Sequence, residues 1–388
     1  MRVEVITPSA DPDHGGFGVR VHSLVSMFSQ FADVNVVVTD WFSGRRVPGV
    51  TYEAIPRRET TWTRLQRLRS YYGMKFPRRT PRDPPDLVVV ESPELIGLHQ
   101  YGPGVPLVLD EHNVYWNLLR YDLVNAPFFK TWLGRRGAVR RRLIPRILAR
   151  AKRFEVEAIR SSAATLVTSD RDREEILVEC PDTAPKVRVL PNCLDVREVP
   201  PLPDPTRSEE VLFVGDFGYV PNQEAAEFIS RTLAPSLPQA QFILAGASPP
   251  AWATGPNVVT PGRVPDLVGH LRDAAVCIAP LAHGSGTRIK ILTYFAASRP
   301  VVATTKAVEG LPVEDGRHLL IRDDPAEFRD AVKGLLENPE ERRRLAAAGR
   351  ELVETQFDWR VHVQTLHDLA IMAAAPISGL DARVPDPA

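Results

Sequence analysis

Short apolar runs alternate with longer stretches of helical spacing along both halves of the chain. The runs in the first half are rich in β-branched residues and almost continuously apolar, as strands buried on both faces are. Helical stretches lie between them, for example at residues 17–30 and 133–160. The runs are VEVITPS, VNVVVTD, DLVVVESP, PLVLDEHN, TLVTSD and VRVLPN. This alternation predicts a parallel sheet with helices on both faces.

A stretch rich in proline and charge interrupts the pattern near the middle of the chain. Its sequence, CLDVREVPPLPDPTRSEE, has no apolar periodicity and is typical of a linker between domains. The alternation then resumes in EVLFVGDF, QFILAG, VVTPGR, VCIAPL, PVVATT and HLLIRDD. We therefore predict two Rossmann-like, doubly wound α/β domains, at residues 1–195 and 210–356, with a linker at 196–209.

The C-terminal part of the chain has a helical pattern and then loses it. Apolar residues recur at helical spacing from Trp359 to Ile371, which predicts a helix within residues 357–375 that packs back toward the first domain. The final residues, 376–388, carry no such pattern, and we predict that they are disordered.

Composition narrows the class of protein. The chain has 388 residues, of which 44% are hydrophobic, as in soluble globular proteins. The start, MRVEVITPSADPD, lacks the apolar core of a signal peptide, which favours the cytoplasm. The cysteines Cys180, Cys193 and Cys277 lack metal-ligand spacing, so we expect reduced thiols and no disulfide framework.

Charge is balanced overall but uneven along the chain. Residues 57–82 hold nine cations and one anion, and residues 120–153 hold eleven cations and one anion. Such stretches indicate either a solvated arginine-rich surface or a peripheral contact with an anionic membrane. They lack aromatic residues interleaved at strand spacing, on which bases could stack, so we expect no nucleic-acid partner.

Loops that follow strands are the places to look for a site, because doubly wound sheets bind ligands at the carboxyl ends of their strands. Gly15 and Gly16 follow the first strand and precede a helix, where they would let the backbone approach an anion. A plain strand-to-helix turn would explain them equally well, since the dinucleotide fingerprint G-x-G-x-x-G is absent. His112 ends the run PLVLDEHN and could bind or deprotonate a hydroxyl, or could be a histidine satisfied by local backbone.

The stretch GSGTRIKIL in the second domain carries the strongest signal. Gly284, Ser285 and Gly286 form a flexible turn, and Thr287, Arg288 and Lys290 open the following helix. Cations at a helix N-terminus oppose its dipole by about 0.3–1 kcal/mol each, and a bound anion would reverse that effect. Backbone N–H groups, hydroxyls, a bidentate arginine and a lysine together suit a diphosphate, although the Walker A pattern is missing. Upstream, we expect Asn222 to be the N-cap of a helix.

These segments resemble the GT-B glycosyltransferases, and in particular the retaining family-4 type. The resemblance rests on GGFGVRVHSL, LDEHNVYWNLLRY, VLPNCLD, LFVGDFGYVPN and PLAHGSGTRIKIL, and covers nearly the whole chain. It implies a GT-B fold, with two Rossmann-like domains facing a central cleft. It also implies a nucleotide-sugar donor on the second domain, an acceptor on the first, and a diphosphate held between them without a metal.

The resemblance also implies roles for individual residues. Gly16 would contact the donor phosphates through its backbone, His112 would lie near the transferred sugar, and Arg288 and Lys290 would hold the diphosphate. We also assign Gly15, Arg20, Gly215, Ser285, Gly286, Thr287, Thr293 and Glu309 to the donor site. Glu309 could reach sugar hydroxyls or could be an ordinary charge of its loop. The sequence departs from the family at the two glutamates of its E-x7-E motif, which fall on Ser285 and Thr293. It also has Asp216 and Asn222 where the family has an arginine and a lysine.

The expected function is therefore metal-independent transfer of a sugar, with retention, from a nucleotide-diphosphate sugar to an acceptor hydroxyl. No cofactor is expected, and the acceptor could be a glycan, a lipid-linked sugar or a small natural product. Glu111 is the nearest candidate for a covalent nucleophile, but we favour front-face displacement, in which the leaving phosphate takes the acceptor proton. Two alternatives stay open: a nucleotide-sugar 2-epimerase, and a non-catalytic subunit that binds nucleotide sugars.

Overall fold

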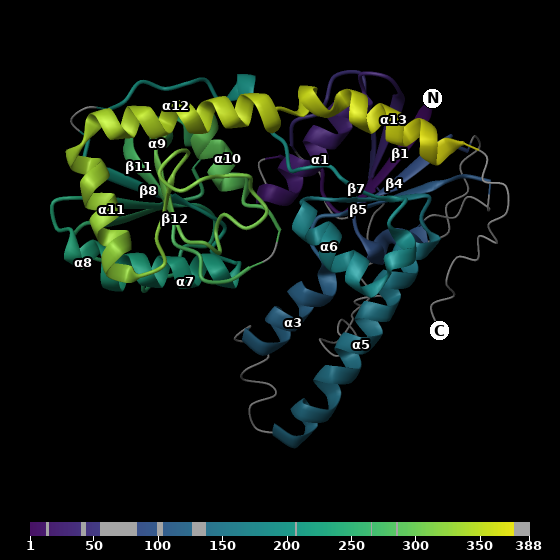
Figure 1. Ribbon diagram of the computed structural model, residues 1–388, viewed down its shortest axis with the longest axis horizontal. Helices are drawn as coiled ribbons and strands as arrows, with labels where there is room; N and C mark the ends of the chain where they lie inside the picture. Colours follow the sequence, from purple (N-terminus) through teal and green to yellow (C-terminus); the bar gives the residue numbers. More distant parts are fainter. Residues whose placement is uncertain are drawn as a thin grey trace. The chain divides into compact units, whose positions relative to one another are not determined.

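The computed structural model describes residues 1–12, 15–39, 44–54, 84–98, 104–125, 137–205, 208–264, 266–284 and 286–375. The chain divides into two units (Figure 1). One consists of Met1–Pro191 together with His362–Ala388, and the other of Asn192–Val361. The basic stretch at residues 57–82 and the tail at 376–388 lie outside the described residues.

The first unit is built on a seven-stranded parallel sheet with the order β3-β2-β1-β4-β5-β6-β7. From β1 the chain adds β2 and then β3 on one side of the sheet. It then adds β4 and the later strands on the other side of β1. The carboxyl ends of β1 and β4 therefore mark the switch point of this sheet, where open α/β folds bind ligands. The strands are β1 (Arg2–Thr7), β2 (Asp33–Val38), β3 (Thr51–Ala54), β4 (Leu87–Val90), β5 (Leu107–Glu111), β6 (Ala164–Val167) and β7 (Val187–Val189).

Each of the apolar runs in the first half of the sequence forms a strand, as predicted. The burial of β4 and β5 is complete along their length, which explains why their sequences do not alternate. The edge strand β3 was not predicted, because its sequence TYEA is short and mostly exposed. Pairing with β2 holds β3 in place. The sequence of β3 itself has no apolar pattern that would signal this pairing.

Helices cover this sheet, and the last helix of the chain belongs to the same unit. Helix α13 packs against α1 and β4, so the C-terminal segment lies on the unit that contains the N-terminus (Figure 1). The helices are α1 (Gly15–Phe28), α3 (Tyr115–Asn125), α5 (Gly137–Ser161), α6 (Asp170–Glu179) and α13 (Val363–Ala374), with short 3-10 turns η1 (Pro93–Leu98) and η2 (Pro181–Thr183).

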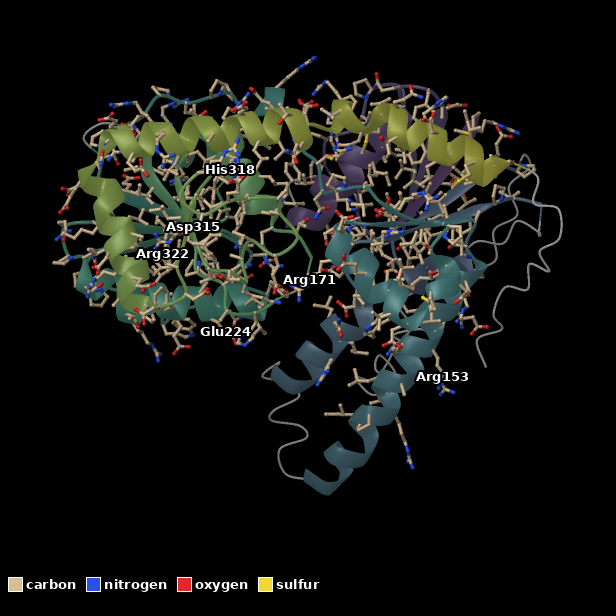
Figure 2. All side chains as sticks on the ribbon, in the orientation of Figure 1. Arg153, Arg171, Glu224, Asp315, His318 and Arg322 are labelled. Atoms are coloured by element: carbon tan, nitrogen blue, oxygen red, sulfur yellow. The ribbon has the colours of Figure 1, made fainter. Side chains whose placement is uncertain are left out.

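Helix α5 is amphipathic and packs against α3. Its residues Ile144, Ile147 and Leu148 pack against the small buried cluster of Leu119 and Ala151. Arginines lie on the other side of the helix, and Figure 2 shows Arg153 pointing away from the rest of its unit. Across the described ranges, every helix is too short or too polar to span a bilayer.

The second unit has a six-stranded parallel sheet with the order β10-β9-β8-β11-β12-β13. Its switch point lies at the carboxyl ends of β8 and β11, which are neighbours. All the apolar runs predicted after residue 210 form these strands. They are β8 (Glu210–Val214), β9 (Gln241–Ala245), β10 (Val258–Gly262), β11 (Ala274–Ala279), β12 (Val301–Ala303) and β13 (Leu320–Ile321).

The helices of this unit have sequence-encoded starts. Asp324 caps α11 by accepting from the backbone N–H groups of Ala326 and Glu327, and Asn338 caps α12 in the same way. The elements are η3 (Val196–Glu198), α7 (Val220–Phe228), the π-helical turn η4 (Ile229–Leu233), α8 (Ala234–Ser236), α9 (Leu267–Asp273), α10 (Ile289–Ala296), α11 (Pro325–Glu337), α12 (Pro339–Gln356) and η5 (Trp359–His362).

The Pro-rich stretch that we predicted as a linker packs on the second unit. The backbone N–H of Leu202 donates to the carbonyl of Ala297, and Arg342 donates to both carboxylate oxygens of Asp204 at 2.8 and 3.0 Å. Arg342 is fully buried, so Asp204 compensates a charge inside the unit. The chain leaves the first unit after Pro191, a few residues before the predicted boundary at 195.

Candidate functional site

The loops after β8 and β11 bring most of the predicted second-domain site residues together. Gly215 follows β8 directly, and Arg288 and Lys290 follow β11 at the start of α10. Because β8 and β11 are adjacent in the sheet, both loops lie at its switch point. Figure 2 shows Glu224 on α7, which follows the first of these loops and bonds to His283 of the second at 2.9 Å.

Lys290 occupies a polar and aromatic cradle in this region. Its ammonium group donates to the Asn222 side-chain oxygen at 2.8 Å and lies 4.1 Å from the centre of the Phe213 ring. Burial, and secondarily the Arg288 guanidinium, lowers the pKa of Lys290 well below its ordinary value. A bound anion would compensate the charge of the ammonium group and so favour its protonated form.

Asn222 is not the N-cap that we predicted. Tyr219 occupies the cap position of α7, and Asn222 lies inside the first turn. Its amide donates to the carbonyl of Asp216 at 2.7 Å, which fixes the amide oxygen toward Lys290. A Cβ on Gly215 would lie 2.8 Å from the side-chain carbon of Asn222, so this glycine is required by the close approach of the asparagine.

Arg288 is the N-cap residue of α10, and its side chain makes no capping hydrogen bond. The guanidinium is 9% exposed and lies against the loop that precedes it, with Nη2 3.5 Å from the carbonyl oxygen of His283. Thr287, the preceding residue, accepts a 2.6 Å hydrogen bond from the Asn192 amide. A helix start that brings together Arg288 and Lys290 is arranged for a ligand with two or more negative charges.

The remaining predicted donor-site residues of this unit differ in their backbone conformation and in their hydrogen-bond partners. Gly286 has a φ of +72° and forms the turn before α10, whereas Ser285 lies outside the described residues. The hydroxyl of Thr293 donates back to the Ile289 carbonyl at 3.1 Å, so its proton is used within the helix. Glu309 pairs with Lys306 in the loop after β12.

In the first unit, His112 belongs to a buried network at the carboxyl ends of β4 and β5. Its Nε2 lies 2.6 Å from Oε2 of Glu91 and 3.4 Å from Oδ2 of Asp110. Arg20 reaches Asp110 from α1, with Nε 2.8 Å from Oδ2 and Nη2 on Oδ1. The network thus contains two carboxylates, one guanidinium and one imidazole.

Arg20 was predicted to bind the donor, and the structure places it in the interior instead. It is 2% exposed, and besides Asp110 it donates to the Leu190 carbonyl at 3.0 Å. Its donors therefore serve the fold of the first unit and the charge of Asp110. Arginine was a reasonable candidate for a phosphate ligand, but its position one turn into α1 points it back toward the sheet.

The pKa values of the titratable groups in the network are shifted in different directions. Burial, and then the Asp110 carboxylate, raises the pKa of Glu91 well above its ordinary value. Burial alone would raise the pKa of Asp110, but Arg20 and His112 hold it below its usual value. Burial lowers the pKa of His112 to about 4. Burial and Asp110 thus favour the protonated form of Glu91, Arg20 and His112 favour the ionised form of Asp110, and burial favours neutral His112.

The same three residues have the spacing of a metal site. Ligand atoms of Glu91, Asp110 and His112 lie within 4.8 Å of one another. Arg20, however, already places a full positive charge on Asp110, which opposes the binding of a second cation there. The residues fit a hydrogen-bonded network better than a metal centre.

The glycine pair of the first unit differs from the prediction in one respect. Gly15 and Gly16 are the exposed first residues of α1 rather than a turn before it. Phe17 follows them and stacks on the His112 imidazole, with 4.2 Å between ring centres and 12° between ring planes. The start of α1 thus covers one face of His112.

Sequence reasoning missed Glu91 and Phe17. Glu91 ends the apolar run DLVVVESP in the same way that His112 ends PLVLDEHN, so a polar residue directly after a buried strand was the available signal. No local pattern signals Phe17, because its role depends on a long-range ring contact.

One family model matches part of the second unit. Residues 208–338 match the family model described as glycosyl transferases group 1. This match covers the loops after β8 and β11, and it makes this part of the chain similar to the type of protein that the sequence resemblance named. A search of curated protein sequences gives no match.

Solved structures share the fold over almost the whole chain. Sucrose-phosphate synthase from Thermosynechococcus elongatus is 16% identical with a TM-score of 0.69, covering 95% of this chain and 98% of the other. HepE from Anabaena, solved with UDP and glucose, is 12% identical with a TM-score of 0.65 and coverages of 95% and 98%. WaaG, a glycosyltransferase of lipopolysaccharide biosynthesis, is 14% identical with a TM-score of 0.62 and coverages of 95% and 99%. The predicted GT-B fold with two Rossmann-like units is confirmed.

Proposed function

We propose that this chain is a retaining glycosyltransferase that needs no metal ion. It transfers a sugar from a nucleotide-diphosphate sugar to the hydroxyl of an acceptor. Arg288 and Lys290 hold the diphosphate, and His112 contacts the transferred sugar.

The observation that carries the proposal is the pair of cations at the start of α10. Arg288 is almost buried and adds to the burial that lowers the pKa of Lys290, so an anion bound here would favour the charged form of Lys290. A diphosphate supplies two or more negative charges and several acceptor oxygens for a guanidinium and an ammonium. The family match over residues 208–338 includes both residues.

The same cations provide the chemistry. Cleavage of a sugar–phosphate bond builds negative charge on the leaving diphosphate and an oxocarbenium-like charge on the sugar. Arg288 and Lys290 stabilise the leaving group, which is the role that a metal ion fills in other transferases. Two protein cations at the phosphates support the metal-independent reaction.

Retention follows by front-face displacement. In this route the leaving phosphate accepts the proton of the acceptor hydroxyl, and the new bond forms on the face that the phosphate leaves. Glu111, the candidate for a covalent nucleophile, is 1% exposed within the first sheet, which favours the route without a covalent intermediate. Neutral His112 can then bind a sugar hydroxyl without adding a competing positive charge.

The nucleotide and acceptor are proposed by class. HepE has been solved with UDP-glucose, so UDP and UDP-glucose are the first donor probes. The arginine-bearing side of α5 fits an anionic surface, which supports a lipid-linked acceptor and a peripheral position at the inner face of a membrane. The proposal also includes a glycan or a small hydroxylated molecule as the acceptor. It includes a location in the cytoplasm as well.

A transfer assay tests the proposal. UDP release from UDP-glucose is followed with and without candidate acceptors, for the wild type and for Arg288→Gln. Arg317→Gln is the matched control, because Arg317 is 62% exposed and pairs with Glu314 at the surface. We expect turnover in the wild type and control, and a loss of about 10- to 100-fold in the variant.

Two results would contradict this function. UDP-glucose that binds without turnover in any acceptor panel would favour a non-catalytic binding subunit, which the back-bonded Thr293 makes a specific alternative. Conversion of the donor to its 2-epimer would identify an epimerase.

A further inference from the structure

Glu91 is a buried acid at the switch point of the first sheet with no assigned role. It directly follows β4, is fully buried, and places Oε2 2.6 Å from the Nε2 atom of His112. A contact this short between buried side chains is a hydrogen bond, and either of the two groups can be its donor. Either Nε2–H donates to Glu91, or the Glu91 carboxyl group donates to Nε2.

The charge balance leaves a proton on Glu91. Asp110 receives both of its strong donors from Arg20, so the single guanidinium of the network compensates Asp110. Burial and the Asp110 charge then raise the pKa of Glu91, which favours its neutral acid form. A neutral carboxyl group has one O–H donor to place.

The contacts of Glu91 decide where this donor points. A hydrogen bond joins the side chains of Glu91 and Asp110, and Asp110 is the ionised acceptor of the two. Within the described part of the chain, Oε1 of Glu91 accepts no hydrogen bond, and Oε2 is the oxygen at the imidazole. A neutral carboxyl group that gives its one proton to Asp110 has none left for Nε2. It can then only accept from His112.

We propose that Glu91 is a positioning residue that fixes His112 as its Nε2–H tautomer and leaves Nδ1 as the hydrogen-bond acceptor. Phe17, stacked on the imidazole at 4.2 Å, holds the plane of the ring. The ring is thereby committed to accept a hydrogen bond from a hydroxyl rather than to donate one. This inference rests on the proposed function for its role in sugar binding, but the tautomer itself does not depend on that function.

Nitrogen-15 NMR of the ligand-free protein tests the tautomer directly. The signals of His112 are assigned as those missing from His112→Asn. In the wild type we expect a protonated-type shift at Nε2 and an unprotonated-type shift at Nδ1. In Glu91→Gln we expect the two shifts to exchange, because the glutamine NH2 group can donate both to Asp110 and to Nε2.

A matched control separates this effect from damage to the fold. Glu155 is also fully buried, and it accepts from the backbone N–H groups of Tyr115 and Trp116 at 2.7 and 2.9 Å. Glu155→Gln should leave the tautomer of His112 unchanged whatever it does to stability. A wild-type Nδ1–H tautomer, or equal shifts in the wild type and Glu91→Gln, overturns the proposal.

Activity gives a second readout. We expect kcat/KM for the donor to fall by about 10-fold or more in Glu91→Gln, as when one strong hydrogen bond to a reacting group is lost. Normal turnover in that variant, with exchanged shifts, would overturn the positioning role. A protein with the predicted shifts but no transferase activity would overturn the proposed function and leave the tautomer standing.

Discussion

The ammonium group of Lys290 donates a 2.8 Å hydrogen bond to the side-chain oxygen of Asn222, which lies 68 positions away in the chain. The two residues lie in the first turns of α7 and α10, the helices that follow β8 and β11, and they meet because these strands are neighbours. Their contact holds Lys290, whose pKa is lowered by burial, at the switch point of the sheet. The first predictions concern this contact.

Nucleotide affinity should depend on pH through Lys290. Its pKa is lowered in the free protein, and a bound diphosphate raises it again, so the complex binds more protons than the free protein. Binding of UDP should therefore take up a proton and weaken as the pH rises above the lowered pKa. Isothermal titration calorimetry in buffers of different ionisation enthalpy measures this uptake.

UDP also titrates near neutral pH, because the second ionisation of a phosphate has a pKa of about 6. Lys290→Gln controls for this effect, since the glutamine side chain cannot take up a proton. Equal proton uptake by the wild type and Lys290→Gln would rule out the role of Lys290.

A carboxylate at position 222 should repel the ligand. Asn222→Asp keeps the shape of the side chain but places a negative charge beside the phosphate site. We expect UDP affinity to fall about 10-fold or more, and Asn222→Ala to lose less because it adds no charge. Equal affinities for wild type and Asn222→Asp, measured by calorimetry, would place the phosphates elsewhere.

Gly215 should not tolerate a side chain. A Cβ there would lie 2.8 Å from the side-chain carbon of Asn222, so Gly215→Ala should cost about 1–3 kcal/mol of unfolding free energy. Gly334→Ala is the control, because nothing lies within 4 Å of its Cβ position in α11. There alanine should stabilise by about 0.5–1 kcal/mol. Urea denaturation measures both, and a harmless Gly215→Ala would contradict the close approach.

The substitution Glu91→Gln should remove a pH-dependent loss of unfolding free energy. The pKa of Glu91 is raised above its ordinary value of 4.5, so its contribution is complete below that value and is lost as the pH rises through the raised pKa. Glutamine imitates the neutral acid at every pH. The unfolding free energy of the wild type should therefore decline relative to the variant from mildly acidic to mildly alkaline buffers. A constant difference between the two proteins would show an ionised Glu91.

The sheets could be predicted from the sequence because their strands are buried on both faces and leave continuous apolar runs. The exception, β3, is exposed and owes its conformation to its neighbour β2. An anion site at Arg288 was predicted because two cations at a helix N-terminus are unfavourable unless an anion is bound there.

The site was predicted less completely than the fold, since side-chain partners come from distant segments. Arg20 was assigned to the donor, but its carboxylate partner Asp110 lies 90 positions away and holds it in the interior. Asn222 was assigned to a helix cap from its local sequence, whereas its role depends on Lys290. Glu91 carried a usable signal at the end of a buried strand that we did not apply.

The central claim is that a diphosphate binds at Arg288 and Lys290, and the affinity of UDP relative to uridine tests it most directly. Calorimetry gives this ratio for the wild type, Arg288→Gln and Lys290→Gln, with the exposed residues Arg317 and Lys333 changed to glutamine as controls. We predict a ratio about 10- to 100-fold lower in the two site variants and unchanged in the controls. The same ratio in all five proteins would contradict the account.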